Sequence, residues 1–314
     1  MKVRFIINPC SGHNRRRPWL PQAIRDYATT RLRESDVAVT EGPGHATELA
    51  RSAIARGHEL VVAVGGDGTM NEVAQAVTNT PAALALVPCG SGNGLALHLG
   101  LPRSLRSALE LISGDGHRIA AIDTGFVNDQ PFFNAMGLGL DAEVSRRFNG
   151  LTKRGLPAYV RAAAAVLWRM PRERCTITAG ETRLTLDTLL VAVANSDQYG
   201  NNARIAPGAH VDDGLLDLVA VEAAGPLRLV ALGPRLFLGN IDRCRDVHRL
   251  RAASFTILRT GPGIVHTDGE TLSAGAEITV RVNPRSLRVL VPAASRLATA
   301  PATIRPSGFV LQLP

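Results

Sequence analysis

The chain has 314 residues, a length that allows two domains of ordinary size, each with its own hydrophobic core. Hydrophobic residues make up 45% and charged residues 20%, a composition that excludes a long disordered portion. The net charge of +8 points to anionic partners such as nucleotide phosphates or anionic lipid headgroups. Because only 4% of residues are aromatic, a nucleic-acid stacking platform is poorly supported, and we expect no nucleic-acid partner.

The sequence lacks the patterns of an export signal and of a membrane-spanning helix. The start, MKVRFIINPCSG, leads directly into a short strand, and no run of about 18 apolar residues occurs. The cysteines lie far apart and form no CxxC pair, so we expect reduced thiols. We therefore expect a cytoplasmic protein that contacts an anionic membrane surface only peripherally. The cysteines are Cys10, Cys89, Cys175 and Cys244.

Strands and helices alternate over the first part of the chain, to about residue 122. This alternation predicts right-handed crossovers and an α/β domain with a parallel sheet. The predicted strands are 3–7, 37–40, 60–64 and 84–87, and the predicted helices are 20–33, 46–56, one that starts at Met70, 93–99 and 104–112. Three of the strands lead into glycine-rich or polar turns, which would line one edge of the sheet.

Beyond about residue 122, short alternating runs are separated by Gly, Pro, Asn and Asp, which predicts an antiparallel β domain arranged as a sandwich. The predicted strands are 176–177, 183–194, 215–221, 254–258, 277–282 and 287–291, and the predicted helices are 156–170 and 227–237. We expect the α/β domain over 1–122 and the β-rich domain over 123–292. The tail at 293–314 ends in apolar residues, and we expect it to return to the first domain.

A glycine-rich turn follows the most apolar strand. Residues 60–64 form a valine-rich run of the kind that a parallel sheet buries on both faces, and 65–69 (GGDGT) follow at once. Glycines let the backbone approach a ligand closely, and backbone N–H groups before a helix suit a phosphate. Asp67 would repel that phosphate unless a divalent cation lies between them. The turn is therefore either a plain strand-to-helix connection or a metal-assisted nucleotide site.

A second glycine-rich loop follows the next strand, at residues 88–96 (PCGSGNGLA). By itself such a loop is merely structural about as often as it is functional. Beside the turn at 65–69, it could hold a triphosphate from the other side through backbone N–H groups and the hydroxyls of Thr69 and Ser91. Neither segment fits the Walker A pattern or the Rossmann pattern.

Four motifs in a fixed order carry a resemblance to a known family: 8–12 (NPCSG), 65–72 (GGDGTMNE), 88–93 (PCGSGN) and 268–270 (DGE). Together they resemble the diacylglycerol kinase catalytic-domain family, which includes bacterial soluble lipid kinases, sphingosine kinases and ceramide kinases. The GGDGT turn alone would be weak evidence, because NAD kinases and phosphofructokinases have similar turns. The four motifs in this order are specific, and the similarity extends to about residue 291.

The resemblance implies a nucleotide-binding α/β domain and a β-sandwich lipid-binding domain, with ATP and Mg²⁺ in the cleft between them. Glu270 matches the proton acceptor of the bacterial enzymes, and Asp141 matches a sphingosine kinase position that contacts the lipid head. Asp123 matches a carboxylate at the domain junction, and we expect it to act in catalysis with Glu270 and Asp67. Asp67 would organise magnesium and phosphate or share the proton work, and 45–46 match a short motif after the second strand. The residues expected around ATP are Asn8, Pro9, Ser11, Gly12, Thr40, Gly66, Asp67, Gly68, Thr69, Asn71, Glu72 and Ser91.

One position departs from the family pattern. Many diacylglycerol kinases have an aspartate directly after the asparagine of the second loop, where this chain has Gly94. The form GSGNG is closer to the sphingosine kinase version. The change removes one possible metal ligand and leaves the identity of the lipid open.

Two other stretches have both an ordinary and a functional interpretation. The turn around Asp213 is either an Asp-Gly hairpin or, by family resemblance, a structural magnesium site completed by the carbonyls of His210 and Leu215. The helix at 156–170 is either ordinary core or a wall of the acyl-chain pocket. Basic residues around that helix are either a solvated face or a surface for anionic membrane. They are Arg146, Arg147, Lys153, Arg154, Arg161, Arg169, Arg172 and Arg174.

The leading hypothesis is therefore an ATP- and magnesium-dependent kinase that phosphorylates a hydroxyl of a diacylglycerol-like or sphingoid lipid. A NAD kinase is a second enzyme hypothesis, because GGDGT and a β-rich second domain occur there too. A lipid-binding regulatory protein without turnover is a third. Retention of Asp67, Asp123 and Glu270 together favours the kinase over that regulatory protein.

Overall fold

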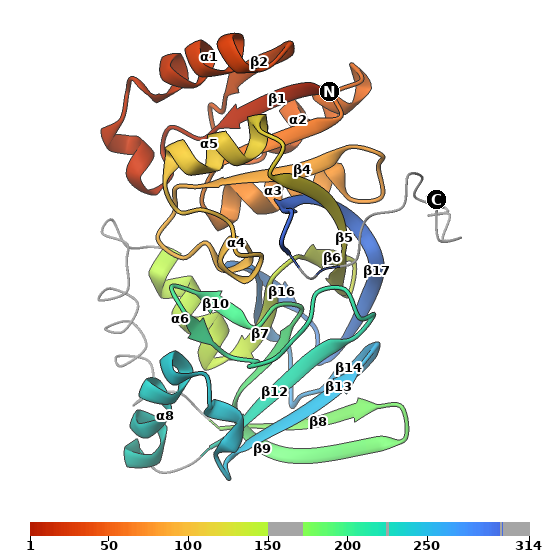
Figure 1. Ribbon diagram of the computed structural model, residues 1–314. Helices are drawn as coiled ribbons and strands as arrows, with labels where there is room; N and C mark the ends of the chain where they lie inside the picture. The colour runs from red at the N-terminus through yellow and green to blue at the C-terminus, as the bar shows by residue number, and fades with distance from the viewer. Residues whose placement is uncertain (150–171, 224–225, 296, 298–314) are drawn as a thin grey trace.

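The computed structural model describes residues 1–149, 172–223, 226–295 and 297 (Figure 1). An α/β region and a mostly antiparallel β region follow one another along the chain, as predicted. Two sequence predictions lie outside the described residues: the helix at 156–170, and most of the tail at 298–314. Among the described helices, none is long and apolar enough to cross a membrane. The four cysteines are free thiols.

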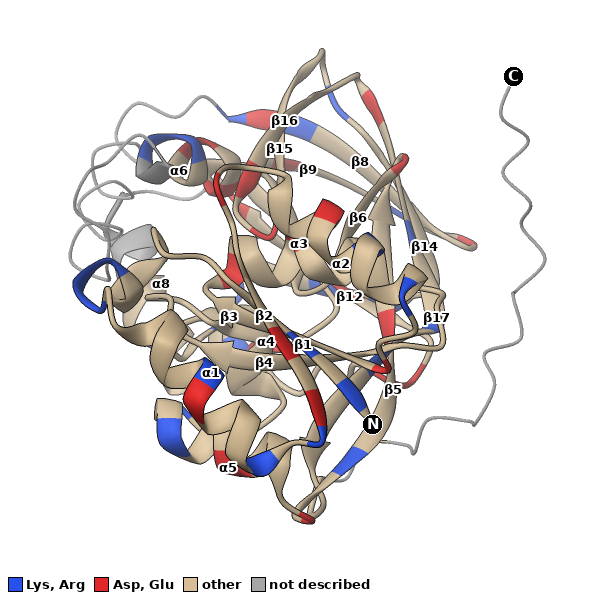
Figure 2. Cartoon of the chain, turned by 90° about the horizontal axis from the view of Figure 1, so that it is seen from above, with Lys and Arg blue, Asp and Glu red and all other residues tan. Residues whose placement is uncertain are grey.

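The N-terminal region contains a parallel sheet in the order β4-β3-β1-β2. Helices α2 and α3 cover one face of the sheet and α1 and α5 cover the other, as Figure 2 shows from above. Along β3, Val61 and Ala63 point into one core and Val62 and Val64 into the other, which explains its uninterrupted apolar sequence. The strands are β1 (Lys2–Ile7), β2 (Glu34–Val39), β3 (Leu60–Gly65) and β4 (Ala83–Pro88), and the helices are η1 (Gly12–Arg16), α1 (Leu20–Arg31), α2 (His45–Ala55), α3 (Asp67–Val77), α4 (Gly94–His98) and α5 (Leu105–Ser113).

The helix after the first glycine turn begins earlier than the apolar periodicity predicts. Helix α3 starts at Asp67, with Gly66 as its N-cap residue, and not at Met70. Gly68 and Thr69 therefore belong to the first helical turn. Asp67 lies in the same turn, where its negative charge is favourable next to the positive end of the helix dipole. Asp67 is consequently fixed by helical geometry and does not sit on a loose turn.

The C-terminal region is built from antiparallel strand pairs around two apolar clusters. Several of its strands were not predicted, because they are short or interrupted by small and polar residues. Its strands are β6 (Gln130–Phe132), β7 (Ala135–Gly139), β8 (Glu173–Ala179), β9 (Thr182–Ala194), β10 (Gln198–Gly200), β11 (Ala203–Arg204), β12 (Leu216–Glu222), β13 (Val247–Ala252), β14 (Ser254–Leu258), β15 (Gly263–Thr267) and β16 (Glu270–Ala274), and its helices are α6 (Leu140–Asn149), α8 (Pro226–Leu238) and η2 (Ile241–Arg243).

Two long strands, β5 (His117–Val127) and β17 (Glu277–Pro292), run through both regions and pair with each other. The first part of β17 pairs with β14, and its last part lies beside β4. The two strands predicted at 277–282 and 287–291 are thus one strand, which continues past a register shift at which Arg285 has a φ of 50°. Because β5 spans residue 122, the division at 122/123 stays a prediction.

The last described residues return to the N-terminal region. The Ala293 N–H donates to the Gly116 carbonyl at 2.8 Å, and the Arg118 guanidinium donates to the Ser295 carbonyl at 2.7 Å. The side chain of Leu297 packs against the core that α2 and α3 cover. These contacts lead the start of the tail to the N-terminal region. The predicted return of residues 298–314 lies outside the described residues.

Candidate active site

Three glycine-containing turns meet where strands β1, β3 and β4 end. A Cβ atom on Gly12 would lie 2.0 Å from the Cys89 carbonyl oxygen, and one on Gly90 would lie 2.6 Å from the Gly66 Cα. Backbone therefore packs directly on backbone, and Gly12 also has a φ of 46°. The structure thus brings together the three turns that the sequence placed along one edge of the sheet.

Side chains from the first turn fasten it to the second. The Asn8 amide donates to Thr69 Oγ1 at 3.0 Å, and its oxygen accepts the Cys10 N–H at 2.9 Å. Asn8, Pro9 and Ser11 are half-buried, whereas Ser91 is exposed. The predicted nucleotide residues of these turns are therefore next to one another, with the Ser91 hydroxyl open to a ligand.

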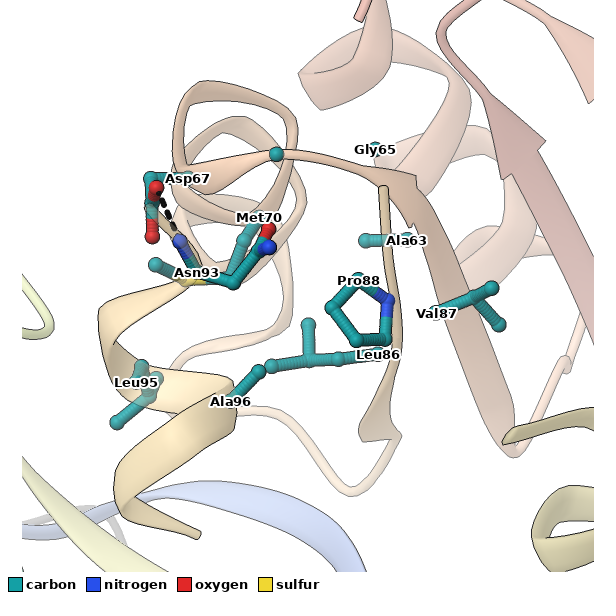
Figure 3. A pocket seen from close by; sticks show the side chains of 11 residues that line it. Ala63, Gly65, Asp67, Met70, Leu86, Val87, Pro88, Asn93, Leu95 and Ala96 are labelled. Carbon is teal, nitrogen blue, oxygen red and sulfur yellow. Dashed lines mark hydrogen bonds between the residues drawn. The ribbon is translucent and has the colours of Figure 1, made fainter. Parts of the chain in front are cut away.

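Asp67 joins the β3–α3 turn to the loop after β4 (Figure 3). Its carboxylate oxygens accept the backbone N–H groups of Asn93 at 2.8 Å and Gly94 at 2.9 Å. Burial raises the pKa of Asp67, and these two hydrogen bonds oppose the increase. Two of the N–H groups expected for a phosphate are thus used within the protein. A small pocket, lined by Ala63, Met70 and nine other residues, lies directly beneath this junction.

The unusual Gly94 is explained by close packing on the C-terminal region. A Cβ atom there would lie 2.6 Å from Asn134 Nδ2 and 3.0 Å from the Tyr199 carbonyl oxygen. The Asn201 N–H also donates to the Gly92 carbonyl at 3.0 Å. An aspartate at position 94, as in many diacylglycerol kinases, does not fit this arrangement, so the loop and β10 approach more closely than a side chain would allow.

Asp268 connects the two regions, a role that the sequence did not predict. Its carboxylate accepts the backbone N–H groups of Phe133, Asn134 and Ala135 at 2.8 to 3.0 Å, and the Asn71 amide of α3 at 2.7 Å. Burial raises the pKa of Asp268, and the four hydrogen bonds oppose the increase. This one side chain therefore ties α3 of the N-terminal region to the β6–β7 connection of the C-terminal region.

Glu270 follows Asp268 after a tight hairpin turn. Asp268 and Gly269 have φ values of 50° and 92°, and Thr267 pairs with Glu270, which is the geometry of a two-residue type I′ hairpin. Glu270 is exposed, and its Oε1 lies 3.7 Å from the position that a Cβ on Gly68 would take. The structure thus brings the predicted proton acceptor to the glycine turn from the opposite region.

The remaining predicted nucleotide residues support this frame. Glu72 accepts the Ala46 N–H at 3.0 Å, so its carboxylate caps helix α2, which has no cap of its own. Thr40 is buried, and its N–H donates to the Ile7 carbonyl at 2.9 Å. Ala46 and Glu72, matched separately to family motifs, are therefore in contact.

Asp123 lies at the junction between the two regions and binds backbone. Its oxygens accept the N–H groups of Arg285 and Gly214, both at 2.7 Å, and burial raises its pKa. These partners belong to the β17 irregularity and to the turn before β12. The hydrogen bonds of Asp123 thus connect it to a different set of segments from those that hold Asp67 and Asp268, and its catalytic role stays a prediction.

The predicted structural magnesium site has competing contacts. Asp213 accepts the Leu215 N–H at 3.0 Å and forms an ion pair with Arg251. The turn joins β11 to β12, which do not pair, so it is not a hairpin. Within the described ranges, no group of three or more His, Cys, Asp or Glu could hold a metal ion. The Leu215 N–H and Arg251 therefore both contact the Asp213 carboxylate, and the magnesium site at His210, Asp213 and Leu215 stays a prediction.

Asp141, the predicted lipid-head residue, is buried in an ion pair. Its Oδ2 lies 2.8 Å from His266 Nε2, and the Tyr199 hydroxyl donates to the same oxygen at 2.6 Å. Burial acts to lower the pKa of His266, but the charge and hydrogen bond of Asp141 raise it overall. The sequence offered no sign of this pair, since neither residue is near the other along the chain.

Comparison with known proteins identifies the class. Residues 2–127 match the family described as the diacylglycerol kinase catalytic domain, and residues 134–291 match the YegS C-terminal NAD kinase beta sandwich-like domain. A diacylglycerol kinase of Mycobacterium tuberculosis (strain CDC 1551 / Oshkosh) is 30% identical over 305 residues, covering 93% of this chain and 95% of the relative. The chain belongs to the diacylglycerol kinase and YegS-like lipid kinase family, and it is a phosphotransferase.

Further relatives agree with this assignment. A protein of Pseudomonas savastanoi pv. phaseolicola (strain 1448A / Race 6), named as a probable YegS-like lipid kinase, is 29% identical over 296 residues, covering 91% of this chain and 95% of its own. The crystal structure of a diacylglycerol kinase from Bacillus anthracis str. Sterne has a TM-score of 0.68 at 19% identity, covering 94% of this chain and 98% of that one. The second similarity supports the fold.

Proposed function

We propose that this lipid kinase transfers the γ-phosphoryl group of ATP to a hydroxyl of a diacylglycerol-like or sphingoid lipid at a membrane surface. In this proposal the region to residue 122 binds the nucleotide, and the region from 123 to 292 binds the lipid. The observation that carries it is the approach of Glu270 to Gly68, which sets an exposed carboxylate beside a glycine-rich turn. Such a turn at a strand end suits phosphate binding.

The proposed reaction transfers one phosphoryl group from ATP to the lipid hydroxyl. The lipid hydroxyl oxygen forms a bond to the γ-phosphorus, and the bond from that phosphorus to the oxygen bridging the β- and γ-phosphates breaks, which releases ADP. The Glu270 carboxylate accepts the hydroxyl proton. General-base assistance contributes about a hundred- to ten-thousand-fold to a rate. Asp268 does not reach the reacting atoms in this proposal, because backbone N–H groups and Asn71 occupy its carboxylate.

Magnesium is included in the proposal because the acidic residues fit it. Mg²⁺ in phosphotransferases commonly uses one or two carboxylates together with phosphate oxygens. Asp67 would supply the carboxylate oxygens at the turn, and each of them accepts one backbone N–H. When bound, the ion would neutralise charge on the transferred phosphoryl group.

Peripheral contact with an anionic membrane is supported by one end of helix α8. Phe237 and Leu238 are 43% and 72% exposed, and Ala231 and Pro234 are exposed on the same side of the helix. Exposed Arg243 follows closely. Figure 2 shows a basic segment on α6. Apolar side chains beside cations suit an anionic lipid surface.

Two other functions remain as alternatives to be tested. The family description of residues 134–291 refers to a NAD kinase-like sandwich, which keeps NAD kinase as the second candidate. A lipid-binding regulatory protein would bind nucleotide without turnover. Incubation with NAD and ATP would give NADP only if the second candidate is correct.

The decisive experiment offers radiolabelled ATP and Mg²⁺ to the purified protein with vesicles that contain each lipid class, followed by mass spectrometry of the products. We expect a phosphorylated lipid from the wild type and about a hundredfold less from Asp67→Ala. A wild type that phosphorylates no lipid of the panel would refute the proposal. Vesicles with and without anionic lipid, tested on the wild type and on Leu238→Glu, would separate membrane contact from catalysis.

A further inference from the structure

A buried ion pair lies directly behind the hairpin that carries Glu270. Asp141 lies in the first turn of helix α6, and His266 is on β15, two residues before the Asp268-Gly269 turn. Both side chains are only 4% exposed, and Asp141 Oδ2 and His266 Nε2 are 2.8 Å apart. The pair is therefore out of reach of bulk water.

The other ring nitrogen of His266 contacts the hairpin turn itself. The Gly269 N–H donates to His266 Nδ1 at 3.3 Å, and Glu270 is the next residue. This contact leaves Nε2 as the ring nitrogen that faces Asp141, 2.8 Å from its Oδ2. The Tyr199 hydroxyl donates to the same Asp141 oxygen at 2.6 Å, so the carboxylate is held from two sides.

The surrounding backbone is shaped around this pair. Gly137 of β7 lies opposite His266 in the strand register. A Cβ atom on Gly137 would lie 2.2 Å from Asp141 Oδ2 and 2.7 Å from His266 Nε2. A glycine at 137 therefore leaves the space that the ion pair fills.

We infer that Asp141 and His266 are positioning residues that fix the turn before Glu270, and that Asp141 is not a contact for the lipid head. This inference rests on the proposed role of Glu270 as proton acceptor. A cationic headgroup would have to break the ion pair with His266 to reach Asp141, whereas the hairpin needs that pair intact. A displacement of about 1 Å at a reacting group can cost about a hundredfold in rate.

The main test compares Asp141→Asn with a matched control, Asp217→Asn. Asp217 is also a buried aspartate of the C-terminal region, with a side chain 2% exposed and an ion pair to Arg249 at 2.6 Å, but it lies on β12. We expect Asp141→Asn to lower kcat about tenfold to a hundredfold with the lipid KM within about twofold of the wild type. Asp217→Asn should lower the Tm and leave kcat unchanged.

Two further variants keep the inference testable if Asp141→Asn folds poorly. Gly137→Ala disturbs the pair by steric contact without changing any titratable group, so it should lower kcat in the same way. Tyr199→Phe removes the hydroxyl that donates to Asp141 and should lower kcat by only about twofold to fivefold. A rise in lipid KM with an unchanged kcat in Asp141→Asn would overturn the inference, because it would mark Asp141 as a head contact.

Hydrogen–deuterium exchange gives a measurement that does not depend on turnover. We expect amides of the peptide 263–274 to exchange faster in Asp141→Asn than in the wild type or in Asp217→Asn. Equal exchange in all three proteins would overturn the inference. If the wild type phosphorylated no lipid, the proposed function would fail, but the exchange comparison would still decide whether the pair holds the turn.

Discussion

Two aspartates hold backbone segments together in this kinase, and they differ in what lies next to them. Asp268 joins α3 to the β6–β7 connection, and Asp123 joins the β17 irregularity to the turn before β12. Exposed Glu270 lies beside the first, whereas the acid close to the second, Asp213, is paired with Arg251. Both aspartates connect segments by accepting backbone N–H groups. Only the hairpin that contains Asp268 also presents an exposed carboxylate, that of Glu270, toward the glycine turns.

The sharpest way to test this contrast is to remove the exposed carboxylate. Glu270→Gln should lower kcat about a hundred- to ten-thousand-fold, because the amide cannot accept the hydroxyl proton, with little change in Tm. Phosphorylation rates measured with radiolabelled ATP would show the loss. Glu277→Gln, another exposed glutamate at the start of a strand, is the control. An equal loss in the control would contradict the assignment.

The junction aspartate should act mainly on stability. Asp123→Asn replaces an acceptor of two backbone N–H groups, and we expect the free energy of unfolding to fall by about 1–3 kcal/mol. Urea denaturation followed by circular dichroism would measure this. A collapse of kcat at unchanged stability would instead support the catalytic role predicted for Asp123 from the family pattern.

Magnesium should have little effect at the Asp213 turn. Because Arg251 already pairs with this carboxylate, we expect the Tm of the nucleotide-free protein to change little between Mg²⁺ and EDTA. The exposed pair itself should contribute at most about 1 kcal/mol, as Arg251→Ala would show. A clear rise in Tm with Mg²⁺ that Asp213→Asn abolishes would restore the predicted site.

A smaller effect is expected at the surface of α6. Glu143 bonds to Arg146, and this contact together with Arg147 lowers the pKa of Glu143 to about 2. A lowered pKa stabilises the folded protein above the ordinary value of 4.5, and that contribution is lost as the pH falls toward 2. Glu143→Gln should therefore lower the free energy of unfolding by about 0.5 kcal/mol at pH 7, a difference that shrinks in acid.

The parts that could be predicted are those that local sequence specifies. Strand β3 and the turns at 8–12, 65–69 and 88–94 are continuous in the chain, so their chemistry was visible and the sheet edge followed. The parts that were missed depend on distant partners. Asp268 was noted only as a member of its motif, because its acceptor role requires the N–H groups of residues 133–135. His266 carries no local signal either, because its partner Asp141 is far away in the sequence.

Local polarity also misled the prediction of β17. Residues 283–286 (NPRS) are polar and contain a proline, which is typical of a break between strands. The structure carries the strand through them, because Asp123 accepts the Arg285 N–H and Ser286 bonds Thr124 of β5. The stabilising contacts come from a strand more than 150 residues away, and no local pattern encodes them.

The passage of β17 into the first region affects how the chain can fold as it is made. Leu287, Val289 and Val291 fill the core beneath α2 and α3, although they come near the end of the chain. Nascent domains usually fold in order as they leave the ribosome. Here the N-terminal sheet and its core stay incomplete until residue 291 has emerged. A truncated chain that ends near residue 127 should therefore be bound by chaperones or degraded by proteases. It should not form a stable N-terminal domain.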